Sequence, residues 1–502
     1  MEHSYLKDKT PFLSEFVKIS VFTLLSLLTL ESAIAQSRYL TFGTGATPMA
    51  LSGDYRAMGW NPGQMSFSPL NHENWKSAVG GLEIGARLSS EALNRSDIWD
   101  GILNRNETNG TWDVSDWNGF IDLVSNESID FNAEALTAGS AKHLGSWVFA
   151  YSNTQHFQAE AFFDQAPLEL LVQGGSDLWT GYFDQLITVS GDTVMNTGEF
   201  SAEELLNFSG GVNINGDEII SDLLGTSRLG FSWQRCHSIG VSKAWKLGSL
   251  RLHTGVSGRI ILGNGFFQLK NTENGLDAFG AFSNGFGLSN IASIATGGVN
   301  NVEDLRQWGP VGQGWGLDVG GVLEWKDKAW VSASISDLGE VEWRGERYST
   351  NTSLNSWSTP VSNSTSITSI VVGAMNPNTW FEAAEFETRV IPNGATFHIG
   401  GGLHLNRFFL IAGEMAFDNP ELIGNSGTRF GGTLIFEPLR YIRGDIGLSK
   451  WGDQSMRVPA GILIKTGKRG YEFGIQSTDI QAIWKDSQPE LGFRAVAMRW
   501  IW

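Results

Sequence analysis

Hydrophobic and polar residues alternate from Gly314 to Trp343, and the alternation predicts two strands joined by a short turn. In the first strand, apolar and small residues fall on one face and mostly polar or small residues on the other, with Val322 as the interruption. A period of two is typical of a strand with one apolar and one polar side. The apolar face carries Trp315, Leu317, Val319, Gly321, Leu323 and Trp325, and the other carries Gly316, Asp318, Gly320 and Glu324.

The length of this first strand suits a membrane. The strand has eleven residues from Trp315 to Trp325, and they rise about 36 Å. A strand of this length tilted by about 45° crosses about 25 Å, the height of the apolar band of a transmembrane barrel. Trp315 and Trp325 stand at the two ends and are candidates for an aromatic girdle. Residues 326–328 form the turn, after which a partner strand runs back. A soluble sandwich also alternates, so the hairpin alone leaves an ordinary half-buried sheet open.

The same period recurs earlier in the chain. Strands are predicted at Ser77–Ser89 and Gly145–Phe157, and clear alternation resumes at Gly230. From Leu250 to Leu262 the basic residues share one face of the strand. A basic side chain in lipid costs about 2–4 kcal/mol near the midplane, so this face is predicted to face water inside a barrel. The lumen-lining candidates are Arg251, His253, Arg259, Asp318 and Glu324.

The last quarter of the chain is densest in strands, with short links. They are predicted at Thr396–Leu405, Phe408–Phe417, Arg429–Glu437, Tyr441–Lys450, Ala460–Thr466, Tyr471–Ser477 and Glu490–Trp502. The final strand places Trp500 and Trp502 on one face as further girdle candidates. An aromatic last residue on such a strand resembles the signal by which barrels are recognised for outer-membrane assembly, so the barrel-assembly machinery is an expected partner. The alternative is a buried last strand of a soluble sheet.

Residues 1–35 are predicted to be a secretory signal peptide. Three lysines precede an apolar run from Ile19 to Leu30, and Ala33-Ile34-Ala35 fits a small-x-small cleavage site before Gln36. A membrane anchor is the alternative, but the run is too short for a spanning helix. Because no comparable run follows, a mature protein in a membrane is expected to cross it as a barrel in contact with outer-membrane lipid.

Composition narrows the function classes. Without residues 1–35 the chain keeps 32 basic and 49 acidic residues, which argues against a nucleic-acid partner. Its single cysteine, Cys236, excludes an intramolecular disulfide framework and any all-cysteine metal cluster. With 61 Gly, 20 Trp and 30 Phe, the chain suits curved strands that carry interfacial rings.

Residues 36–70 lack sustained alternation and form a candidate separate segment before a barrel domain at 71–502. The piece from Ala46 to Phe67 contains Asp54 and an Asn61-Pro62-Gly63 turn. It resembles the N-terminal segment of FadL-type fatty-acid transporters and the related PorV-type barrels, except that Gly63 replaces the usual Ala and the Met-Gly-Gly-Ala type run is missing. The resemblance implies a hatch inside the barrel, with Asp54, Asn61, Pro62 and Gly63 as its candidate residues. An ordered arm outside the barrel is the alternative.

Further motifs extend this resemblance over most of the mature chain. Gly314–Gly320 gives a Gly-x-Gly-x-Asp-x-Gly strand, Asp337-Leu338-Gly339 ends the next one, and Leu262–Phe267 reads LGNGFF. Together they resemble a Bacteroidota family of outer-membrane barrels of unknown function that is itself FadL/PorV-like. The resemblance implies an all-β transmembrane antiparallel barrel of about 14 strands, where the patterns alone allow 12 to 16. Polar stretches at 98–130, 165–226 and 271–309 are predicted to be long extracellular loops.

Signatures of catalysis or cofactor binding are mostly absent from the sequence. There is no Gly-x-Ser-x-Gly elbow, phosphate-binding loop or His-Glu-x-x-His helix. His253 and Ser257 lie about 13 Å apart along one strand face, too far for a dyad. We therefore predict neither enzymatic activity nor a cofactor.

One segment resembles the opening of a calcium loop, from Asn213 to Asp217. Glu218 stands at the usual Gly position, and Leu224 stands where a bidentate acid is needed. An Asn/Gly turn is favoured, so no metal residues are assigned. On the lumen face, Asp318 and Glu324 are expected to form salt bridges with Arg251 or Arg259, and binding of a polar solute is the alternative.

Two functions fit these patterns. The first is FadL-like transport of a hydrophobic or amphipathic small molecule through the outer membrane. The second is a PorV-like scaffold whose long loops bind a secreted or surface protein in a secretion or motility apparatus. A soluble periplasmic β-protein is the third hypothesis, and cell fractionation would separate it from both.

Overall fold

A computed structural model describes residues 44–67, 69–70, 75–90, 125, 127–165, 185–188, 190–197, 200, 207–212, 225–272, 275–283, 309–350, 381–418, 428–439, 441–451, 455–466, 470–483 and 490–502. Nearly all the regular structure in these ranges is β-strand. The predicted signal peptide (1–35) and the calcium-like segment (213–224) lie outside them, as do most of the three predicted loops. No helix in the described ranges is long and apolar enough to cross a membrane.

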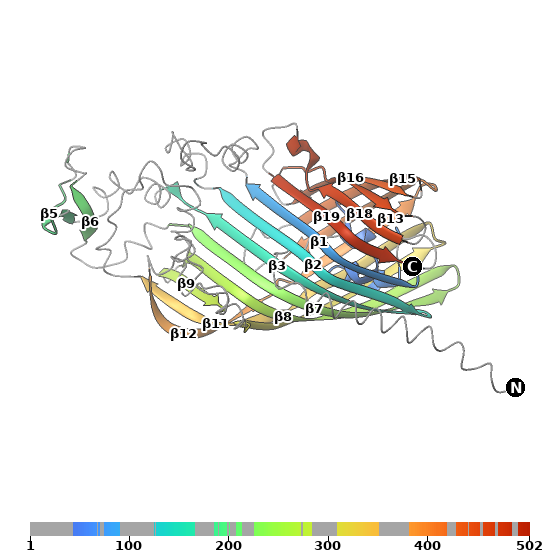
Figure 1. Ribbon diagram of the computed structural model, residues 1–502, viewed down its shortest axis with the longest axis horizontal. Helices are drawn as coiled ribbons and strands as arrows, with labels where there is room; N and C mark the ends of the chain where they lie inside the picture. The colour runs from blue at the N-terminus through green and yellow to red at the C-terminus, as the bar shows by residue number, and fades with distance from the viewer. Residues whose placement is uncertain are drawn as a thin grey trace.

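Fourteen antiparallel strands close into a barrel, as predicted (Figure 1). Each strand pairs with the next, β19 pairs with β1, and β8 pairs with β10. In order round the wall the strands are β1 (Ser77–Ser90), β2 (Ser128–Leu144), β3 (Trp147–Phe162), β7 (Arg228–Leu247), β8 (Leu250–Thr272), β10 (Gly312–Trp325), β11 (Ala329–Thr350), β13 (Thr396–His404), β14 (Phe409–Asp418), β15 (Thr428–Leu439), β16 (Ile442–Trp451), β17 (Ala460–Lys465), β18 (Gly470–Ser477) and β19 (Glu490–Ile501).

Two further strands extend one side of the wall. Strand β9 (Gly275–Phe282) pairs with the far parts of both β8 and β11, in line with β10. Strand β12 (Phe381–Pro392) pairs with the far part of β11, in line with β13. Residues 271–272 and 275–282, within the predicted loop at 271–309, are therefore strand, which corrects that prediction. The start of this polar stretch is strand because β8 extends to Thr272, well beyond its predicted end at Leu262.

The two ends of the barrel differ in their connections. At the end of the barrel where β1 begins and β19 ends, neighbouring strands are joined by short turns, such as 145–146, 248–249 and 326–328. The connections at the other end include 91–127 and 163–227. Bacterial outer-membrane barrels have short periplasmic turns and long extracellular loops. We call the end with short turns the near end and the other the far end.

A separate small sheet lies within the second predicted loop. Strands β4 (Gln185–Thr188), β5 (Thr193–Met195) and β6 (Phe208–Val212) pair only with one another among the described strands. The short 3₁₀ turn η6 (Ile480–Ile483) precedes β19.

The outer face of strand β10 is apolar and exposed. On the hairpin at 314–343, Trp315 and Trp325 are 52% and 50% exposed, and the alternate positions between them also point outward. Val322, the one residue that broke the pattern, is 1% exposed and faces the lumen. It packs with Phe67 and Leu70 of the N-terminal segment, so the interruption belongs to a contact inside the barrel.

The N-terminal segment, residues 44–67 and 69–70, lies inside the barrel. It forms three short turns: α2 (Pro48–Leu51), η1 (Asp54–Ala57) and η2 (Pro62–Met65). Turn α2 contacts β13 and β14, while η1 contacts β2 and β3 and η2 contacts β7, β8 and β10. Since these strands lie on different sides of the wall, the segment crosses the lumen.

Candidate functional site

The Asn61-Pro62-Gly63 turn fixes η2 against the wall. The Asn61 side chain accepts a hydrogen bond from the Gly63 amide (3.0 Å) and donates one to the Gly321 carbonyl (3.2 Å). A Cβ at Gly63 would lie 2.8 Å from the Gly321 Cα and 2.9 Å from the Gly320 carbonyl oxygen. This close backbone approach explains why a residue without a side chain stands at position 63.

Asp54 ties η1 to the last strand. Its backbone takes a left-handed φ of 53°, which Asp tolerates better than most residues. The carboxylate pairs with Arg499 of β19, which also pairs with Glu472 of β18. Asp54 and Arg499 are almost fully buried, at 0% and 1% exposure. Buried charges persist only when they are paired, so this carboxylate–guanidinium–carboxylate group fixes the position of η1.

Tyr55 ties the same turn to the first strand. Its hydroxyl donates to Glu83 of β1 (2.8 Å), and its ring lies where a Cβ at Gly80 or Gly139 would stand. Burial, and then the Glu83 carboxylate, raise the pKa of Tyr55 well above its ordinary value. The phenol therefore remains a donor, and η1 bridges the seam at which β1 meets β19.

The predicted lumen residues Arg259 and Asp318 form a second buried charged group. Arg259 pairs with Asp318 (2.5 Å) and with Asp337. Asp318 also accepts from Ser257 (2.6 Å) and from the Gly59 amide of the N-terminal segment (3.2 Å). One wall carboxylate thus neutralises a wall cation and holds the segment.

The remaining predicted lumen residues meet at the end of η2. His253 Nδ1 lies 3.0 Å from Ser66 Oγ, and His253 Nε2 lies 3.2 Å from Glu324. Arg251, which is half exposed near the near end, also pairs with Glu324 (3.4 Å). The order Ser66–His253–Glu324 has the connectivity of a catalytic triad. However, Ser66 Oγ also lies 2.7 Å from Ser242 Oγ, so this serine joins the segment to β7 and β8.

The opposite wall holds α2. Glu414 of β14 accepts from the amides of Met49 (2.8 Å) and Ala50 (3.3 Å), and the Trp330 indole donates to the Ala50 carbonyl (3.1 Å). Apolar packing accompanies these bonds, in a cluster that includes Leu51 and Phe67. The segment is therefore held on every side by polar contacts, with apolar packing between them.

Beyond the segment, toward the far end, aromatic residues pack together on the lumen side of the wall. Trp343 of β11 lies over the positions where a Cβ at Gly263 or Gly312 would stand, and its ring is stacked on Phe266 at 5.0 Å. This aromatic section consists of Cys236, Ile261, Phe266, Phe279, Ala281, Val341, Trp343 and Ile391. The Trp343 indole nitrogen is buried and has no hydrogen-bond partner among the described residues. Here an apolar lining surrounds one unused donor.

The other predicted residues take these places. Trp500 is 43% exposed on the outer face, and Trp502 is half-buried at the near end. Pro62 opens η2, as expected for a residue with a fixed φ at the start of a turn.

Sequence reasoning missed Arg499, Glu472, Glu83 and Glu414, although a signal was present. Each lies on a strand face opposite outward apolar residues, as Arg499 does between Met498 and Trp500. No group of three or more His, Cys, Asp or Glu side chains in the described ranges is placed to hold a metal ion.

A family model matches part of the chain. Residues 237–384 match the Family of unknown function (DUF5723), a stretch that includes the hairpin at 314–343. No curated protein matches the chain.

Among solved structures, the chain is similar to the Ralstonia pickettii toluene transporter TbuX, with 9% identity, TM-score 0.43, and 94% of this chain and 99% of that one covered. It is also similar to the Pseudomonas putida toluene transporter TodX (10%, 0.41, 94% and 97%) and to a Pseudomonas aeruginosa FadL homologue (9%, 0.39, 94% and 97%). Likeness at this level says nothing about a substrate.

Proposed function

We propose that this protein is an outer-membrane barrel that conducts a hydrophobic or amphipathic small molecule, with the N-terminal segment as its hatch. The observation that carries the proposal is the filled lumen. Residues 44–67 and 69–70 cross the barrel near its near end and are held there by hydrogen bonds and ion pairs to the wall. A solute that passes through the barrel must displace these contacts.

The aromatic section is the proposed binding site for this solute. It lies on the far-end side of the hatch, so a molecule that enters from outside reaches it first. Its rings and aliphatic side chains suit an apolar body, and the Trp343 indole offers one hydrogen bond to a polar end. Binding there precedes passage because the hatch blocks the lumen beyond it.

A binding measurement tests this assignment. Trp343→Ala removes both the largest ring of the section and its unused donor, so binding of oleate, measured by isothermal titration calorimetry in detergent, should weaken by at least tenfold. Trp315→Ala removes an equally large ring from the outer face and should leave the affinity within twofold. Equal affinities in all three proteins, or no oleate binding by the unaltered protein, would contradict the proposed site.

One observation favours the partner-binding function as a second candidate. Strands β7, β8 and β11 have 20 to 23 residues, whereas β13 to β19 have 6 to 12. Twenty-three strand residues rise about 76 Å, more than a tilted strand needs to cross an apolar band of about 25 Å. One side of the wall therefore projects beyond the band, where it can bind a secreted or surface protein. Purification from solubilised membranes without a stoichiometric partner would remove this candidate.

A further inference from the structure

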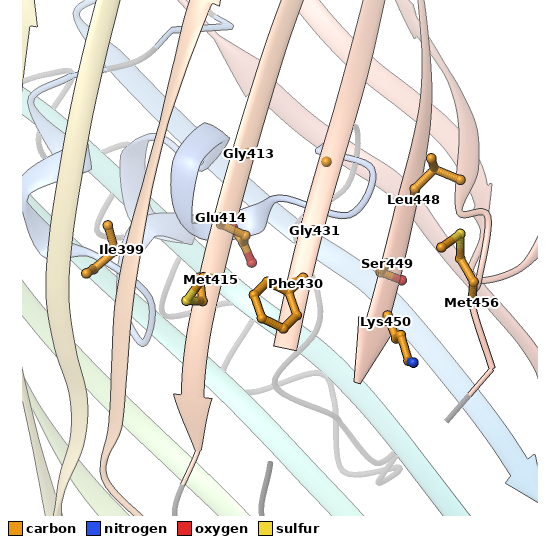
Figure 2. Close-up of a pocket in the computed structure, with 11 residues that line it drawn as sticks. Ile399, Gly413, Glu414, Met415, Phe430, Gly431, Leu448, Ser449, Lys450 and Met456 are labelled. Atoms are coloured by element: carbon orange, nitrogen blue, oxygen red, sulfur yellow. The ribbon is translucent and has the colours of Figure 1, made fainter. Parts of the chain in front are cut away.

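A shallow apolar groove runs along the outer wall over strands β13 to β16 (Figure 2). Its volume is about 420 Å³, within the range of small-molecule sites. Gly413 and Gly432, which are direct partners across β14 and β15, lie in its lining. Ile399, Met415, Phe430, Leu448 and Met456 supply its apolar side chains.

The two glycines are not required by packing. A Cβ at Gly413 would come no closer than 3.7 Å to another atom, and one at Gly432 no closer than 4.0 Å. Both distances are ordinary contacts, so larger residues would fit. Glycine in a strand interior is unfavourable and often marks a place where a ligand approaches closely. The effect of this pair is to hollow the wall.

A single cation stands at one side of the groove. Lys450 neighbours Phe430 across β15 and β16, is exposed, and forms no hydrogen bond or ion pair with another described residue. It lies near the far end of β16, whose described strand stops at residue 451. A lysine on the lipid face costs about 2–4 kcal/mol at the midplane and about 0–1 kcal/mol near the interface. Lys450 therefore belongs at headgroup height.

We propose that this groove binds one acyl chain of a phosphorylated lipid of the outer leaflet, with Lys450 pairing with the phosphate. The inference rests on the proposed membrane location of the barrel and is independent of transport. The glycines let a chain lie against the backbone, and the exposed apolar side chains flank it. Lys450 is the charged residue among the outward positions of β14, β15 and β16 in the described ranges, which gives the site a preference for an anionic headgroup.

Native mass spectrometry of the detergent-solubilised full chain, titrated with phosphatidylglycerol or phosphatidylcholine, tests the proposal. One phosphatidylglycerol should be retained about tenfold more tightly than phosphatidylcholine. Gly413→Leu combined with Gly432→Leu fills the groove and should weaken retention at least tenfold. Gly444→Leu is the matched control, because a Cβ there meets no atom closer than 4.0 Å and it lies on β16 outside the groove. It should leave retention within twofold.

Lys450→Gln tests the headgroup contact separately and should make the two lipids equal. The proposal is overturned if the filled groove retains lipid as well as Gly444→Leu does, if Lys450→Gln leaves the preference unchanged, or if a protein co-purifies at the groove in place of lipid. Oleate uptake should be unchanged in every variant, so failure here is distinguishable from failure of the transport proposal.

Discussion

In the lumen, acidic and basic side chains are buried together as ion pairs, and Asp54 is the clearest example. Asp54→Asn leaves Arg499 paired only with Glu472 and should lower the free energy of unfolding by about 3 kcal/mol, because a buried partner is removed. Urea titration of the protein in lipid vesicles measures the change. Glu342→Gln, which breaks the exposed Arg344–Glu342 pair, should cost less than about 1 kcal/mol. Equal losses of free energy of unfolding in the two variants would contradict a larger contribution from the buried Asp54–Arg499 pair.

Gly63 tests the fit of the N-terminal segment against the wall. In Gly63→Ala the new Cβ meets the Gly321 backbone at 2.8 Å, so η2 should move away at a cost of about 1–3 kcal/mol. Trypsin should then cleave at Arg56, which is buried in the unaltered protein, at least tenfold faster. Gly258→Ala is the control, since nothing lies within 4 Å of a Cβ there. Unchanged protection of Arg56 in Gly63→Ala would argue against a closely seated segment.

Strands can be predicted from the sequence wherever one face is apolar and the other polar. The predicted strands at 396–405, 429–437 and 471–477 match β13, β15 and β18 to within two residues at each end. Strand β2 escaped prediction because bulges and alanines blur its period, with Ala133, Ala135 and Ala138 on its outward side and a register shift at Leu136/Ala138. Strands β9 and β12 were missed because their pairing partners are far extensions of β8 and β11, which a local pattern does not reveal.

The free-energy cost of a charged side chain on the outward face of a strand depends on its depth in the membrane. Val319→Arg places a charge near the middle of the outward face of β10 and should destabilise the barrel in lipid vesicles by about 2–4 kcal/mol. Gln313→Arg lies on the same strand beyond Trp315 and should cost about 0–1 kcal/mol. If both variants lose the same free energy of unfolding, as urea titration reports it, the outward face of β10 does not contact hydrocarbon.

At the scale of the whole molecule, closure of the barrel and the position of the N-terminal segment depend on each other. Turn η1 contacts both strands of the β1/β19 seam, through Tyr55 to Glu83 and through Asp54 to Arg499. The candidate residues of the segment came from its resemblance to a known N-terminal hatch, whereas several of its wall partners were predicted because inward charges stand out against apolar strands. The expected ion pairs of Asp318 and Glu324 with Arg259 and Arg251 are present. The pairing of Asp54 with Arg499 was not predicted, because the two positions are far apart in the sequence and only the closed wall brings them together.

The most direct test of the account locks the hatch in place. In a Cys236→Ala background, Ser66→Cys with Ser242→Cys joins the segment to β7, where the two hydroxyl oxygens now lie 2.7 Å apart. Ser152→Cys with Ser238→Cys, a paired site on β3 and β7, joins two wall strands and leaves the segment free. Uptake of radiolabelled oleate into proteoliposomes should fall at least tenfold in the oxidised hatch lock, return on reduction, and remain unchanged in the wall lock. Equal uptake by the oxidised and reduced hatch lock would contradict passage past a movable hatch.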